Sequence, residues 1–110
     1  MENEEKYEGW ENRETWLVNL HLENEASSYR YWREQAEQSR SSAAKTDQVH
    51  AKIWTEAQAA LFTLADQMRE QVTEAIAVES PSLVGDLIAT ALSRVEWREI
   101  AEHWLEKDAT

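Results

Sequence analysis

The residues with the most distinctive spacing are acidic, and they form two rows at helical intervals. The first row is Asp66, Glu70 and Glu74, and the second is Glu96, Glu99, Glu102 and Glu106. Residues three or four apart lie on one face of an α-helix, and a step of four advances about 6 Å. Successive phosphates on one nucleic-acid strand are roughly 6–7 Å apart. The rows therefore indicate a surface that imitates phosphates, and a face that only keeps the protein soluble is the alternative.

The net charge of −11 is unevenly distributed along the 110 residues. Residues 1–25 contain eight acids and two bases, and residues 54–110 contain eleven acids and four bases. Residues 26–53 have three acids and five bases, so this middle segment is basic. An acidic balance of this size argues against direct binding to nucleic acids or to anionic membranes.

Residues that could support catalysis or bind a metal are few. The three histidines fall on three different predicted helices: His21, His50 and His103. Glu99 and His103 are one turn apart and could share a metal, but neither HExxH nor a second ExxH pair is present. The chain has no cysteine and no glycine-rich phosphate loop. We therefore expect a binding protein rather than an enzyme, with no catalytic residues, no metal and no cofactor.

The six tryptophans divide into predicted core and predicted surface residues. Four fall on apolar helical faces and are expected in the core: Trp16, Trp32, Trp97 and Trp104. Trp10 has acidic neighbours, and Trp54 lies beside the apolar stripe of its helix rather than on it. Because exposed tryptophans often act as binding hot spots, these two are the candidate contact residues.

The elements that position these residues are predicted to be helices. Two glycines and one proline provide little hairpin chemistry, whereas helix-forming residues are abundant. We expect an all-α fold, a single-domain bundle of about four to five helices around one long central helix. Residues 1–11 are predicted to be a mobile acidic arm whose end Tyr7 and Trp10 anchor, and residues 12–110 to be the domain.

The first half of the domain is predicted to hold two helices. Asn12 is a suitable N-cap for the first, which would turn three residues inward: Trp16, Leu17 and Leu20. Residues 16–22 also alternate as a strand would, but no partner strand is evident. A second helix is expected over residues 26–40, followed by a loop at 39–42.

The second half is predicted to contain the long helix and two shorter ones. With Thr46 as N-cap, an apolar stripe continues for about 30 residues through Ile53, Ala57, Leu61, Leu64, Met68, Val72 and Ile76. Ser80-Pro81 would end this helix. A short apolar helix follows from Leu83 to Leu92, and a capping box of Ser93 and Glu96 would begin the last one.

Two segments resemble a family of small proteins encoded by phages and plasmids. Residues 9–25 match an N-x-E-T-W-x-V-x-L-x-L-x-N-[DE] opening, and residues 82–105 match an apolar helix followed by V-x-W-x-x-I-A-x-x-W. The resemblance implies a setting of host–parasite conflict but no biochemical role. The shared residues are caps and core residues by type: Asn12, Glu14, Thr15, Trp16, Trp97, Ile100 and Trp104.

Charge and resemblance together predict an acidic anti-defence protein, an anti-CRISPR or antirestriction inhibitor that imitates DNA. It would occupy a nucleic-acid-binding surface of a host nuclease complex through the two acidic rows, Trp10 and Trp54. The alternative is a helical adaptor or assembly protein, or a homodimer, that binds through aromatic contacts. The sequence shows no signal peptide and no apolar run of roughly 20 residues, so we expect it in the host cytoplasm and not in a membrane.

Overall fold

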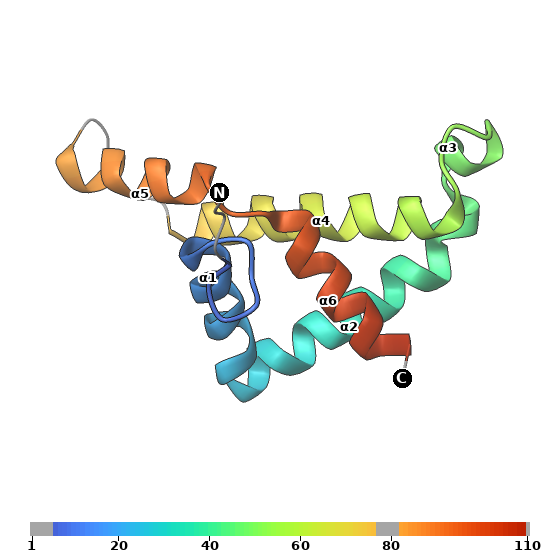
Figure 1. The fold of residues 1–110 in the computed structure, drawn as a ribbon. Helices are drawn as coiled ribbons and strands as arrows, with labels where there is room; N and C mark the ends of the chain where they lie inside the picture. Colours follow the sequence, from blue (N-terminus) through green and yellow to red (C-terminus); the bar gives the residue numbers. More distant parts are fainter. Residues whose placement is uncertain (1–5, 77–81, 110) are drawn as a thin grey trace.

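The structure, a computed structural model, describes residues 6–76 and 82–109, and this part of the chain is all-α (Figure 1). The helices are α1 (Arg13–Asn24), α2 (Ala26–Ser42), the 3-10 helix η1 (Ala43–Lys45), α3 (Asp47–His50), α4 (Glu56–Ala75), α5 (Leu83–Ser93) and α6 (Trp97–Ala109). Within these residues, β pairing is limited to one isolated bridge between Tyr7 and Trp10. The predicted all-α fold is confirmed. No helix in the described ranges is long and apolar enough to cross a membrane.

The core lies where α4, α2 and α6 meet. The longest helix, α4, packs against both of the others, and α2 and α6 also pack against each other (Figure 1). The largest fully buried side chains of α4 are Leu64 and Met68, and those of α6 are Ile100 and Trp104. The long central helix predicted from the apolar stripe is therefore confirmed, although its start is not.

The central helix begins nine residues later than the sequence predicts. Thr46 is an N-cap, as expected, but only of the four-residue α3. Lys52 then has a left-handed backbone with φ 62°, and α4 starts after Thr55. Thr55 and Gln58 form a capping box in which each side chain accepts the other residue's backbone N–H, at 3.1 and 2.9 Å. This box stabilises a new helix start, and Ile53 is left 67% exposed.

Two other predicted boundaries are wrong. The expected loop at 39–42 is the last turn of α2, where the hydroxyls of Ser41 and Ser42 donate to the Gln38 carbonyl. Ser93 does not cap the last helix, because it is the final residue of α5 and donates to the Thr90 carbonyl. The predicted stop at Ser80-Pro81 lies outside the described residues.

The segment that could have been a strand is helix α1, but it is turned differently from our prediction. Its buried residues are Thr15, Asn19 and Leu22, whereas Leu17 is 44% exposed. The expected inward side was wrong because hydrogen bonds, rather than apolar contact alone, select the buried face. Asn19 Oδ1 accepts a hydrogen bond from the indole N–H of Trp104 at 2.7 Å in the core.

Hydrogen bonds and an ion pair connect the first turn of α1 to the junction between α5 and α6. Asn12 is the N-cap, as predicted: its Oδ1 accepts from the Thr15 N–H at 2.8 Å, and its Nδ2 donates to the Arg94 carbonyl at 2.7 Å. The Thr15 hydroxyl accepts the Glu96 N–H at 2.9 Å, and Glu14 forms an ion pair with Arg94 at 3.3 Å. The N-x-E-T stretch therefore joins distant parts of the chain.

Candidate protein-binding surfaces

The acidic row of α6 lies beside the N-terminal turn, and together they form a charged hollow. This hollow, which we call the acidic groove, has a volume of about 340 Å³. It is lined by Glu8, Gly9, Trp10, Glu99, Glu102, His103 and Glu106. A neighbouring depression shares Glu99 and Glu102 and adds Lys6, Glu11, Leu61, Glu96 and Arg98. Carboxylates from residues 8–11 and from 96–106 thus share one surface. The sequence predicts the row on α6 but not the contribution of Glu8 and Glu11.

The N-terminal turn is held against the domain by backbone and aromatic contacts. Tyr7 and Trp10 exchange two backbone hydrogen bonds of 2.7 and 2.8 Å, and Gly9 between them has φ 89°, a conformation that glycine adopts without strain. The Trp10 ring meets the His103 ring edge-on, with centroids 5.1 Å apart. The Glu11 N–H donates to Glu99 Oε1 at 3.1 Å. Of the predicted acidic arm, residues 6–11 therefore contact the domain, and residues 1–5 lie outside the described ranges.

The two tryptophans predicted as surface anchors both pack inside their own chain. Trp10 and Trp54 are half-buried and lie against the core. Trp54 meets Phe62 edge-on at 5.0 Å, and the Arg98 guanidinium lies 4.1 Å from the centre of the Phe62 ring. Trp10 still reaches the acidic groove, whereas Trp54 does not line it. Of the four tryptophans expected in the core, Trp32 and Trp104 are buried, and Trp16 and Trp97 are half-buried.

The acidic row of α4 stands apart from the acidic groove. Asp66, Glu70 and Glu74 are all exposed, as their spacing predicts, and none of them lines the groove or the depression beside it. Asp66 also forms an ion pair with Arg69 at 3.6 Å. The two rows therefore belong to different surfaces, and only the row on α6 gains further carboxylates from another segment.

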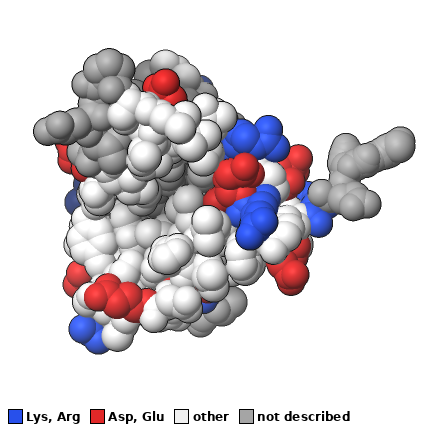
Figure 2. Space-filling view, turned by 90° about the vertical axis from the view of Figure 1, so that its left-hand side faces the viewer, with Lys and Arg blue, Asp and Glu red and all other residues white. Residues whose placement is uncertain are grey.

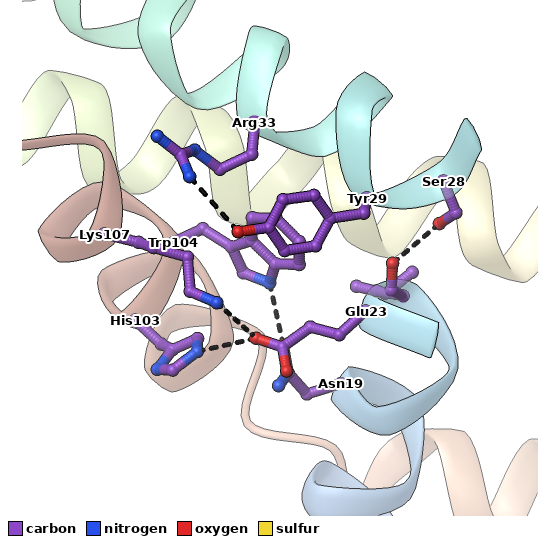
Figure 3. A network of polar contacts seen from close by, with 9 residues as sticks. Asn19, Glu23, Ser28, Tyr29, Arg33, His103, Trp104 and Lys107 are labelled. Atoms are coloured by element: carbon purple, nitrogen blue, oxygen red, sulfur yellow. Dashed lines mark hydrogen bonds and ion pairs between the residues drawn. The ribbon is translucent and has the colours of Figure 1, made fainter. Parts of the chain in front are cut away.

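A polar network that the sequence does not reveal joins α1 to α6 (Figure 3). Glu23 Oε2 lies 2.8 Å from His103 Nε2 and 3.1 Å from Lys107 Nζ. Partial burial raises the pKa of Glu23, but the hydrogen bonds from His103 and Lys107 outweigh it and hold the pKa below its usual value. His103 thus pairs with Glu23, and no metal-binding cluster of three or more ligands occurs within residues 6–76 and 82–109.

Replacing Glu23 with glutamine should lower stability in a pH-dependent way. Because the folded-state pKa is lowered, the carboxylate stabilises the fold above its unfolded pKa of about 4.5 and loses this effect as pH falls through the folded value. We expect Glu23→Gln to cost about 1–2 kcal/mol at pH 7 and little near pH 3, measured by urea unfolding. Glu70→Gln, on an exposed α4 position, should cost almost nothing at either pH. An equal loss at both pH values would show that the charge of Glu23 is not responsible.

A second hollow is almost entirely apolar. This hollow, which we call the apolar groove, has a volume of about 270 Å³ and lies between α1, the end of α4, and α5. It is lined by Glu14, Leu17, Val18, His21, Leu22, Val72, Ile76, Ile88, Ala91, Leu92 and Val95. Beside it, α5 exposes Leu83, Val84 and Leu87 by 74, 59 and 61%. Figure 2 shows the end of the molecule that bears α5, where a broad uncharged area lies beside a mixed group of acidic and basic side chains. The apolar composition of residues 83–92 is the sequence signal for this surface.

Fold and surfaces define a small all-α protein that presents an acidic groove and an apolar groove. A family model matches residues 3–102, and the chain belongs to this family, DUF7249, a family of unknown function. No curated protein and no solved structure matches the chain. The family match covers residues 9–25 and residues 82–102 of the two segments on which the sequence resemblance rests. It includes the Asn12–Thr15 turn and three acids of the α6 row, Glu96, Glu99 and Glu102, but not Glu106.

Proposed function

We propose that this protein is a non-enzymatic inhibitor that binds a basic, nucleic-acid-binding surface of a host nuclease complex. The observation that carries the proposal is the convergence of Glu8 and Glu11 with Glu99, Glu102 and Glu106 around the acidic groove and the depression beside it. These carboxylates come from two segments about 90 residues apart in the chain. The hydrogen bond from the Glu11 N–H to the Glu99 carboxylate joins the two segments. An anti-CRISPR or antirestriction role in a phage or plasmid setting, and therefore in the host cytoplasm, is part of this proposal.

The physical basis is electrostatic. Glu99, Glu102 and Glu106 occupy successive turns of α6, so their Cα atoms advance by about 4.5–6 Å along the axis, comparable to phosphate spacing. A cleft lined by lysine and arginine can form with such a surface the charge pairs that it otherwise forms with phosphates, and these contacts weaken as salt rises. The net charge of −11 also accelerates encounter with a basic partner. The half-buried Trp10 provides an apolar floor in the groove next to these charges.

The row on α6, rather than the row on α4, is the proposed contact. Glu102 and Glu106 are exposed and four residues apart, and so are Glu70 and Glu74. Only Glu102 and Glu106 lie beside the carboxylates of the N-terminal turn. The two pairs therefore provide matched variants that change the net charge equally at different places.

The test measures protection of a targeted plasmid in cells that carry a defined CRISPR or restriction system. We expect the unchanged chain to raise transformation efficiency, and E102K/E106K to reduce this protection by about 100-fold or more, because two attractive contacts become repulsive. E70K/E74K, with the same change in net charge, should keep most of the protection. Protection that survives E102K/E106K would show that the acidic groove is not the contact surface.

Binding to the partner should depend strongly on salt. In a pull-down from lysate of cells that carry the same system, the nuclease complex should be retained at about 50 mM salt and released at about 500 mM, where screening shortens the reach of charges to a few ångströms. Retention that is equal at both concentrations would favour an apolar contact and contradict the electrostatic proposal.

A further inference from the structure

Helix α5 exposes an apolar face that residues 6–76 and 82–109 leave uncovered. It contributes no buried residue, and Leu83, Val84 and Leu87 are each more than half exposed. Figure 1 shows α5 extending away from the α2–α4–α6 core at one end of the molecule. An 11-residue helix has little stability in water without packing, and large exposed apolar patches on soluble proteins mark interaction sites. The apolar groove beside α5 adds Leu17 and Ile76 to this uncovered face.

We propose that a second copy of this chain covers this face. The two copies would be related by a two-fold axis, with their α5 helices antiparallel and the exposed side of each α5 lying on the apolar groove of the other. One face carries both the projecting helix and the groove, so it is complementary to itself, as an isologous interface requires. This inference does not depend on the proposed inhibitory function, because the acidic groove is built from other residues.

The charges on α5 favour this occupant and this direction. Asp86, Thr90 and Arg94 are spaced by four residues, so they form one row with an acid near the start and a base at the end. Antiparallel pairing centred on Thr90 places each Asp86 opposite the Arg94 of the other copy, at both ends of the interface. The Arg94 Nε atom lies 3.3 Å from Glu14, and a guanidinium has further N–H groups for a second carboxylate.

The acidic surfaces of the molecule would repel each other, whereas this face carries few charges. The chain carries a net charge of −11, and no residue of either acidic row lines the apolar groove. Among the residues that line the apolar groove, the ionisable ones are Glu14 and His21. Glu14 is already paired with Arg94. A like-charged partner can therefore approach at this face at a low electrostatic cost.

The test is the sedimentation behaviour of the full chain between about 1 and 200 μM, a range that spans weak to moderate dimers. We expect a dimer for the unchanged chain and for I53E, and a monomer for L87E at every concentration. Ile53 is a matched control because it is 67% exposed, close to the 61% of Leu87, but lies between α3 and α4 rather than on α5 or in the apolar groove. Circular dichroism should show that all three remain folded and largely helical, with at most the loss of α5 in L87E. A monomeric unchanged chain, or an L87E variant as dimeric as I53E, would overturn the proposal.

Two further variants test the antiparallel arrangement. D86R places two arginines opposite each other at both ends of the interface, so the dimer should dissociate about tenfold more readily. Because the chain contains no cysteine, T90C introduces a single thiol. Oxidation should link two T90C chains efficiently, whereas a Q48C control on α3 should remain largely unlinked. Unchanged dissociation in D86R, or equal linking of the two cysteine variants, would contradict the antiparallel arrangement.

Discussion

Trp104→Ala should remove about 3–5 kcal/mol of folding free energy, the largest loss that we expect from a single substitution in this chain. Trp104 is fully buried and is the largest of the fully buried side chains. It contacts Tyr29 and Lys107 of the network in Figure 3, with ring centroids 5.4 Å apart for Tyr29. Because domains of this size are stable by about 5–15 kcal/mol, the variant should unfold at much lower urea concentrations, as measured by circular dichroism.

Part of this loss comes from a hydrogen bond rather than from packing. The Trp104 indole N–H donates to Asn19 Oδ1 at 2.7 Å, and Asn19 is only 4% exposed. Trp104→Phe keeps an aromatic ring but removes the N–H donor. Its loss of folding free energy should be clearly smaller than that of the alanine variant but still exceed about 1 kcal/mol. Trp54→Ala removes the same side chain from a half-buried position and should cost less than Trp104→Ala. A loss for Trp104→Ala no greater than that for Trp54→Ala would contradict this view of the core.

The sequence predicts the fold class and the central helix because both depend on periodic apolar spacing. Leu64, Met68, Ile100 and Trp104 follow that spacing and are buried. The start of the central helix is missed because a local capping box at Thr55 competes with a stripe that continues through Ile53. Periodicity alone does not reveal such competition, since the residues on both sides of the break fit the same pattern.

The buried face of α1 is missed for a different reason. Thr15 and Asn19 are polar, and polar residues are expected outside. Their partners, Glu96 and Trp104, are more than 80 residues away in the chain, so no local pattern predicts the hydrogen bonds that bury them. The same separation hides the pairing of Glu23 with His103 and the convergence of Glu11 with Glu99. The spacing predicts which carboxylates form a row, but only the tertiary fold determines which row acquires neighbours.

Thr15→Val should cost about 1–3 kcal/mol, although the two side chains have nearly the same shape. Thr15 is fully buried, and its hydroxyl donates to Asn12 Oδ1 at 2.7 Å while accepting the Glu96 N–H at 2.9 Å. Valine leaves that N–H without its acceptor at the start of α6. Thr15→Ser keeps the hydroxyl and should recover most of the stability in urea unfolding.

The Thr15 hydroxyl lies between α1 and the junction that leads into α6. We therefore also expect its loss to have a local effect at this junction. In Thr15→Val, amide hydrogen exchange at Glu96 should accelerate more than exchange in the centre of α4, because the lost bond holds that junction and not the core. Asn12→Ala removes the hydrogen bond to the Arg94 carbonyl. The double variant should lose less folding free energy than the sum of the losses in the two single variants, since the side chains share one network. Strictly additive losses would show that Asn12 and Thr15 act independently, and the N-x-E-T stretch would then contain two separate caps rather than one clamp.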